Sequence, residues 1–306
     1  MDARLPNFLI VDAMKSGTTS LWRYLKQHPQ IYMPSLKEPR ILASSIFINP
    51  GDEIYRFHRV CKSCTVSTFE DYVKLFSDAR NEKAIGEASP HYLYTHSTTI
   101  PVIKKYLGDV KIIIILRNPA DRAFSAYKHT SIIDRTESMP FEKCLELEEE
   151  RRKNEVMPMM HFYKDLGFYY NQVNAYMENF SRVKVVLLDD LENDPKRLVQ
   201  DIYDFLDVDS SFTPSLDSRH NSSPPPNMFL DNFILNYNHP LKRFFRPILL
   251  STIGLNNTER LLNLLKRGEQ IKMNPETRRY LTELYKDDIL KLQDLIQREL
   301  SSWLRQ

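Results

Sequence analysis

Residues 8–20 read Phe-Leu-Ile-Val-Asp-Ala-Met-Lys-Ser-Gly-Thr-Thr-Ser and give the clearest indication of the fold. The apolar run Phe8–Val11 has the length of a buried strand, and an amphipathic helix is expected to follow the loop. A strand, a short loop and a helix in this order present backbone N–H groups to a phosphate. Gly17 permits close backbone approach, and Lys15 supplies a positive charge. The alternative is an ordinary strand-to-helix turn, in which Gly, Ser and Thr are common.

The same loop differs from a Walker A motif. In that motif Gly-Lys-Ser/Thr closes the loop and its hydroxyl holds magnesium, whereas here the lysine precedes the glycine. Hydroxyl groups are nevertheless plentiful, and we expect four of them to add donors for an anion: those of Ser16, Thr18, Thr19 and Ser20. We therefore assign no metal ligand here.

Further along the chain, two more apolar runs are typical of strands buried on both faces of a parallel sheet, 110–116 and 183–188. Residues 83–86 are expected to form another short strand, and helical patterns recur between these runs. The sequence predicts an α/β fold with a central parallel sheet flanked by helices. We expect one domain over residues 1–306, with a helical C-terminal part at 257–306.

A second corner follows the strand at 110–116. The segment Ile115-Leu-Arg117-Asn-Pro-Ala-Asp-Arg-Ala-Phe-Ser125 puts Arg117 at the end of a central strand, where open α/β sheets bind ligands. Ser125 lies about two turns into the following helix and can return toward the strand end. An arginine and a hydroxyl suit a second phosphate. Arg117 could instead be a structural ion-pair partner.

Charge and cysteine content limit the classes of function. Lys and Arg total 42 and Asp and Glu 40, so the formal net charge is +2 and no overall field indicates a nucleic-acid partner. Cys61 and Cys64 have a zinc-knuckle spacing, but no second ligand pair follows. No apolar run reaches the roughly 18–20 residues of a membrane span. We expect a cytoplasmic protein if the chain is full length, or a domain of a larger protein.

Taken together, the two corners resemble PAPS-dependent sulfotransferases of the heparan-sulfate-type and bacterial branch. Lys15–Ser20 is similar to the family's 5′-phosphosulfate loop, and Leu116–Ser125 to its 3′-phosphate motif. Smaller segments match in order: Lys37-Glu38-Pro39, Gly86–Tyr92, Leu188–Pro195, Phe205-Leu206 and His220–Ser223. Two departures stand out, because Ala88 replaces a usual lysine and Ile41-Leu42 replaces a usual aromatic pair.

This resemblance implies a P-loop-like three-layer fold and metal-independent, in-line transfer of a sulfuryl group from PAPS to an acceptor hydroxyl or amine. The product would be 3′-phosphoadenosine 5′-phosphate (PAP). Lys15 would neutralise charge on the bridging oxygen, and Glu38 matches the family's general base. Glu38 could also be only a loop ion pair, and His220 or His91 could act as base, orient the acceptor, or merely cap or fill the core. The segment Lys266-Arg267-Gly268 resembles the family's basic loop that closes over the nucleotide, in which case Arg267 would bind it. Alternatively, this segment is an ordinary charged loop between helices.

The sequence does not identify the acceptor. Segments 40–65, 131–165 and 221–255 are the expected acceptor walls, and their mixture of aromatic and basic residues suits a glycan, a lipid, a polyketide-type hydroxyl or a small alcohol. Two other functions compete. One is a P-loop kinase or NTPase, with Asp189 and Asp190 as a Walker B end. The other is a module that binds adenine nucleotides without catalysis.

Overall fold

A five-stranded, wholly parallel sheet forms the centre of the molecule, in the order β2-β3-β1-β4-β5. The computed structural model describes residues 4–43, 66, 68–153, 158–216 and 272–305. The strands are β1 (Phe8–Asp12), β2 (Ile31–Tyr32), β3 (Ala84–Ala88), β4 (Lys111–Leu116) and β5 (Val183–Leu187). The predicted α/β class with a parallel sheet is confirmed. The two-residue edge strand β2 was not predicted.

Strand β1 lies between β3 and β4 and is buried along its whole length. Phe8 pairs in register with Lys111 of β4, and Asp12 pairs with Ile115. Because side chains alternate along a strand, Leu9 and Val11 enter one core and Phe8 and Ile10 the other. Residues 8–11 therefore pack in apolar surroundings on both faces of the sheet, which explains their uninterrupted run of hydrophobic side chains, whereas the last residue of the strand, Asp12, is a buried carboxyl.

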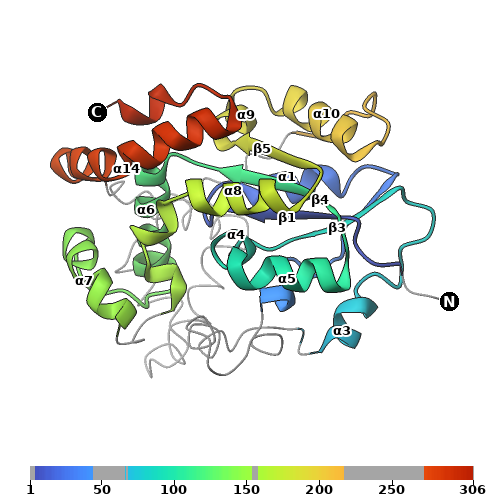
Figure 1. Ribbon diagram of the computed structural model, residues 1–306, viewed down its shortest axis with the longest axis horizontal. Coiled ribbons are helices and arrows are strands. Elements are labelled where there is room, and N and C mark those ends of the chain that lie inside the picture. Colours follow the sequence, from blue (N-terminus) through green and yellow to red (C-terminus); the bar gives the residue numbers. More distant parts are fainter. Residues whose placement is uncertain (1–3, 44–65, 67, 154–157, 217–271, 306) are drawn as a thin grey trace, which may run out of the picture.

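Helices cover both faces of this sheet (Figure 1). On the Leu9 and Val11 face, the core is completed mainly by α5 (His96–Tyr106), α6 (Pro119–Lys128), α8 (Tyr170–Asn179) and α14 (Pro275–Ile296). On the opposite face lie α1 (Thr18–Leu25), α9 (Leu188–Asn193) and α10 (Pro195–Leu206). The remaining elements are α3 (Phe69–Lys74), α4 (His91–Tyr94), α7 (Phe141–Lys153), η1 (Ile41–Ala43), η3 (His129–Ile133), η4 (Met159–His161), η5 (Asp165–Gly167) and η6 (Ser301–Leu304).

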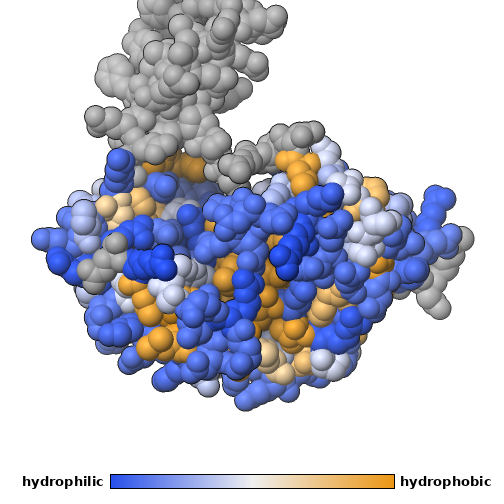
Figure 2. All heavy atoms as spheres, turned by 90° about the horizontal axis from the view of Figure 1, so that it is seen from above, coloured by the Kyte–Doolittle hydropathy of each residue, from blue (hydrophilic) through white to orange (hydrophobic). Residues whose placement is uncertain are grey.

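One face of the molecule can be judged by its hydropathy. Figure 2 shows a face that is mostly hydrophilic, with apolar side chains visible as small patches between charged ones. Within the part of the chain that the structure describes, no helix combines the length and the apolar character needed to cross a membrane.

Candidate functional site

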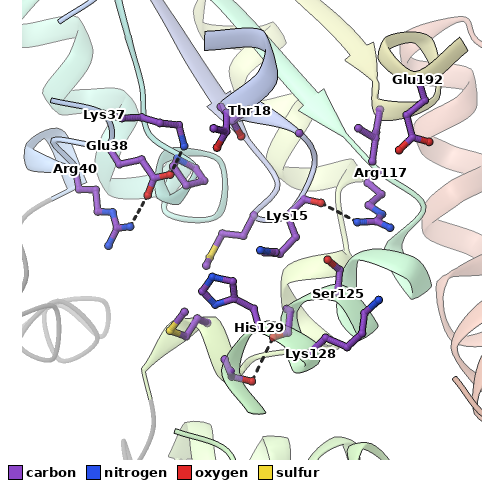
Figure 3. A pocket seen from close by; sticks show the side chains of 18 residues that line it. Lys15, Thr18, Lys37, Glu38, Arg40, Arg117, Ser125, Lys128, His129 and Glu192 are labelled. Atoms are coloured by element: carbon purple, nitrogen blue, oxygen red, sulfur yellow. Dashed lines mark hydrogen bonds and ion pairs between the residues drawn. The ribbon is translucent and has the colours of Figure 1, made fainter. Parts of the chain in front are cut away.

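A cavity of about 420 Å³ opens where the carboxyl ends of the sheet strands meet their following loops. Strands β1 and β4 are neighbours, yet the chain leaves them toward opposite sides of the sheet, which is where α/β proteins bind ligands. Lys15 lies in the middle of the cavity, with Glu38 on one side and Arg117 and Ser125 on the other (Figure 3). Three segments far apart in the sequence thus converge on one space.

The loop after β1 leaves the first turn of α1 open. Lys15 and Gly17 both have left-handed backbone angles, with φ of 73° and 94°. Helix α1 begins at Thr18, and no side chain caps its N-terminus. Its first N–H groups therefore stay available to an anion. Of the predicted loop residues, those that line the cavity are Lys15, Gly17, Thr18 and Thr19, whereas the side chains of Ser16 and Ser20 are buried elsewhere.

Arg117 is fixed against this loop from the end of β4. Its Nη1 donates to the Lys15 carbonyl at 3.1 Å, and its own carbonyl accepts from the Tyr169 hydroxyl at 3.0 Å. Asn118 then caps α6 by accepting the N–H groups of Ala120 and Asp121. Because this cap fixes the start of the helix, Ser125 faces the same cavity as Arg117, as the sequence predicted.

Positive charge is concentrated around the cavity. Burial, followed by the nearby Arg117 guanidinium, lowers the pKa of Lys15. The same two causes lower the pKa of Lys128, which lies one turn after Ser125. Cations that lower one another's pKa repel each other, and a bound anion removes that repulsion. The arrangement is suited to a ligand with more than one phosphate-type group.

Glu38 lies in an unusual turn beside the cavity. Its φ of 58° and that of Arg40, 57°, are left-handed, a conformation that non-glycine residues rarely adopt. Lys37 Nζ lies 2.5 Å from Glu38 Oε1, and Arg40 pairs with the other carboxylate oxygen. Burial raises the pKa of Glu38, but the ion pairs with Lys37 and Arg40 outweigh it and lower the pKa to about 2. In this arrangement Glu38 is a carboxylate held by two cations.

His129 is a functional candidate that the sequence analysis did not assign. It lines the cavity below Lys15 (Figure 3). Its Nδ1 lies 3.0 Å from Asp134 Oδ2. Burial, then Lys15, lowers the pKa of His129, so its ring is neutral near pH 7. A neutral imidazole that is oriented by a carboxylate can accept a proton. His129 lies four residues, about one helical turn, after Ser125, and this spacing could have placed it on the same side of the helix from the sequence alone.

Other residues were missed or lie elsewhere. The cavity is also lined by Met14, Arg40, Met160 and Glu192, to none of which the sequence analysis gave a role. His91 begins α4 and is not among the lining residues. Several expectations concern positions outside the described residues: His220, Arg267, Cys61, Cys64, and most of the acceptor segments 40–65 and 221–255. In the third expected acceptor segment, 131–165, Met160 is described and lines the cavity.

The two aspartates proposed for a Walker B end have other partners. Asp190 accepts the Leu187 N–H at 2.9 Å and forms two hydrogen bonds with Arg298, at 2.7 and 2.8 Å. Asp189 lies 3.3 Å from the Trp303 indole nitrogen. Neither residue is among those lining the cavity. These carboxylates connect α9 to the C-terminal segment, which weakens the kinase interpretation.

Comparison with known proteins agrees with this geometry. A family model described as "Sulfotransferase domain" matches residues 5–223. The membrane-associated sulfotransferase kil1 of Dictyostelium discoideum is 39% identical over 144 residues, which is 46% of this chain and 27% of that protein. The bifunctional heparan sulfate N-deacetylase/N-sulfotransferase 4 of Mus musculus is 26% identical over 321 residues, which is 99% of this chain and 31% of that protein. The chain thus spans less than a third of the length of these two curated relatives.

Similarity to a solved structure covers both chains. The crystal structure of a sulfotransferase from Alicyclobacillus acidocaldarius aligns with a TM-score of 0.73 and 32% sequence identity. The alignment covers 99% of this chain and 100% of that one. The cytoplasmic location expected from the sequence stays a prediction, since one relative's name places it at a membrane.

Proposed function

The chain belongs to the sulfotransferase domain family, and on this premise we propose that it transfers a sulfuryl group from PAPS to an acceptor hydroxyl or amine. The observation that supports this most is the single cavity shared by the Lys15 loop, the Arg117 and Ser125 corner, and the Glu38 turn. Two anion-binding corners and a proton acceptor are what such a transfer needs. We treat residues 1–306 as one catalytic domain.

In the proposed reaction, the acceptor oxygen or nitrogen attacks sulfur while the bond from sulfur to the bridging oxygen breaks. The sulfuryl group joins the acceptor, PAP leaves, and the acceptor proton passes to a base. Lys15 and the N–H groups of the first turn of α1 would hold the 5′-phosphosulfate, where negative charge develops on the bridging oxygen. Arg117, Ser125 and Lys128 would hold the 3′-phosphate.

Glu38 is the proposed base, on the condition that acceptor binding loosens one of its ion pairs. A carboxylate with a pKa of about 2 accepts protons poorly near neutral pH. An acceptor that draws Lys37 or Arg40 away would restore the basicity of Glu38. His129 with Asp134 is the second candidate, because it is neutral near pH 7 and borders the same cavity.

The acceptor is proposed by class only. The name of one relative contains heparan sulfate, which makes a glycan hydroxyl or amine the first class to test. Lipid, polyketide-type and small alcohols follow from the sequence analysis. A screen with sulfur-labelled PAPS across these classes, with mass spectrometry of the product, tests the choice.

The lysine of the loop provides the sharpest test. Lys15→Ala is expected to lower kcat by about 10²–10³-fold while the fold is kept, because one charge at the developing oxyanion is removed. Lys26→Ala is the matched control, since Lys26 follows α1, contacts Trp22 and Ser35, and is not among the residues that line the cavity. Near-normal transfer by the Lys15 variant would contradict the mechanism.

The same assay separates the competing functions. Transfer of labelled sulfate that persists in EDTA supports the proposal. ATP hydrolysis that requires magnesium would support the kinase alternative. Tight binding of PAP without turnover of any acceptor would support a binding module.

A further inference from the structure

The turn that contains Glu38 is hydrogen-bonded to the end of strand β3. Two residues of this turn, Glu38 and Arg40, have left-handed backbone angles although neither is glycine. Such angles persist only where neighbouring groups fix them. The groups that fix this turn therefore control where the Glu38 carboxylate lies.

Two hydrogen bonds connect the turn to the end of β3. The Glu38 N–H donates to the Ala88 carbonyl at 3.2 Å. The Arg40 N–H donates to Ser89 Oγ, also at 3.2 Å. Ser89 is fully buried, and its own N–H donates to the Ile10 carbonyl of β1 at 3.1 Å, so its position is set by the sheet.

Glu87 sets the direction of the Ser89 hydroxyl. Ser89 Oγ donates its one hydrogen to Glu87 Oε2 at 2.8 Å, which leaves its lone pairs free to accept the Arg40 N–H. Glu87 is 1% exposed and is not among the residues that line the cavity, so it has no direct access to a ligand there. Burying a carboxyl group costs free energy unless its oxygens accept hydrogen bonds, and Ser89 provides one of these.

The neighbouring helix α4 supports the same segment. The Tyr92 hydroxyl accepts the Leu42 N–H at 3.3 Å, just beyond Arg40, and hydrogen bonding by Tyr92 also stabilises the Glu87 carboxylate. Arg40, at the end of the turn, and Leu42, just after it, thus depend on groups that interact with Glu87.

We propose that Glu87 is a positioning residue for acceptor activation: through Ser89 it holds the left-handed Lys37–Arg40 turn so that Glu38 faces the cavity. Glu87 touches neither the acceptor nor the nucleotide. The inference rests on the proposed function, in which Glu38 accepts the proton. It adds a residue whose effect on the reaction passes wholly through Glu38.

A double-mutant cycle between Glu87 and Glu38 tests this. Glu87→Ala is expected to lower kcat about tenfold in the otherwise unchanged chain and less than about twofold in the Glu38→Gln background, because linked residues are not additive. The KM for PAPS should stay within about twofold in both. Glu87→Gln should restore most of kcat, since its amide oxygen can accept the Ser89 hydrogen.

Glu148 provides the comparison for a purely structural role. It is also a buried glutamate, and it accepts the N–H groups of Lys164 and Asp165 at 2.7 and 2.8 Å. Any loss of kcat in Glu148→Ala should be the same in both backgrounds. If Glu87→Ala fails to fold, Ser89→Ala takes its place in the cycle.

The outcomes distinguish this inference from the proposed function. An equal loss of kcat from Glu87→Ala in both backgrounds, with Glu38→Gln itself impaired, overturns the positioning role alone. A Glu38→Gln variant with normal kcat overturns the assignment of the base, and the positioning role with it. Absence of transfer by the unmodified chain to every acceptor class would contradict the proposed function itself.

Discussion

At the scale of single residues, the loop after β1 depends on one glycine. Gly17 has φ of 94°, and a Cβ atom there would lie 2.7 Å from Leu188 Cδ1. Both the backbone angle and the space therefore favour glycine. Since α1 begins at the next residue, a shift of Gly17 moves the N–H groups that the proposed phosphosulfate requires.

Gly17→Ala is expected to lower the free energy of unfolding by about 3 kcal/mol, of which the backbone angle costs about 1–2 and crowding against Leu188 the rest. Gly108→Ala is the control, because Gly108 also has a positive φ, 77°, but open space around it. That variant should lose only about 1–2 kcal/mol and keep PAP binding. Denaturant unfolding and titration with PAP measure both effects; equal losses in the two variants would refute the crowding argument.

Glu87 makes stability depend on pH. Burial, opposed by hydrogen bonding from Tyr92 and Ser89 and reinforced by Glu38, raises the pKa of Glu87 to about 7. The folded protein therefore keeps this proton between pH 4.5 and 7 while the unfolded chain loses it, so stability falls as pH rises through this window. Tyr72 and Tyr176 interact electrostatically with Glu87. Burial first, and then the charge of Glu87, raises the pKa of each tyrosine.

Removing the titration should remove this slope. Glu87→Gln is expected to unfold with a free energy that changes less between pH 5 and pH 7.5 than that of the unmodified chain, the difference being up to about 3 kcal/mol. Urea unfolding at several pH values provides the measurement. Parallel pH dependences for the two proteins would show that Glu87 titrates normally.

At the scale of elements, two helix caps of the same type have different consequences. Asn118 caps α6 and its Nδ2 also donates to the Trp303 carbonyl at 3.2 Å. Asn274 caps α14 by accepting the Glu276 N–H at 2.9 Å. Only the first cap lies between Arg117 and Ser125, so only it fixes both side chains of the second anion corner.

Asn118→Ala and Asn274→Ala should each lower the free energy of unfolding by about 1–2 kcal/mol, the ordinary worth of an N-cap. In addition, Asn118→Ala should weaken PAP binding about tenfold or more, because Arg117 and Ser125 lose their common orientation. Calorimetric titration of PAP against both variants checks this. Equal affinities would mean that the corner does not depend on its cap.

The elements show which features the sequence could predict. Strands β1 and β4 were predicted because both are continuous apolar runs bounded by loop residues. The two-residue strand β2 has no period to detect, and α5 contains Pro101, which argues against a helix interior. Helix α3 covers only Phe69–Lys74, because turns follow it although apolar residues continue at helical spacing.

For the candidate site, the meeting of Lys15 with Arg117 and Ser125 in one cavity was predictable, because each segment directly follows a strand of the parallel sheet. Their role as anion corners stays a proposal. The role of His129 depends on η3, a π-helical turn that brings Asp134 beside its ring, and residue types do not indicate such a turn. The ion pairs of Glu38 likewise depend on left-handed angles at Glu38 and Arg40, which no residue pattern predicts.

At the scale of the whole molecule, the cavity lies between two strand–helix units that are far apart in the sequence, β1–α1 and β4–α6. The β1–α1 unit contributes Lys15 and Thr18, and the β4–α6 unit contributes Arg117 and Ser125. A nucleotide bound to both should stabilise the entire fold, because it binds the folded chain and not the unfolded one.

PAP at about 100 times its dissociation constant should therefore add about 2.7 kcal/mol to the free energy of unfolding. For a chain of 306 residues the melting temperature should rise by roughly 4 °C. Lys15→Ala should lose most of this shift at the same PAP concentration. A shift retained in full would place the nucleotide away from the loop.

The central position of β1 has a consequence during synthesis. Its partners come late, since Phe8 pairs with Gly86 of β3 and with Lys111 of β4. A ribosome therefore releases this strand, apolar over residues 8–11, long before either neighbour exists. Parallel pairing over such sequence distances is slow. Until Lys111–Leu116 emerges, Phe8–Asp12 lacks its β4 partner, so during this interval the segment is open to association with other chains.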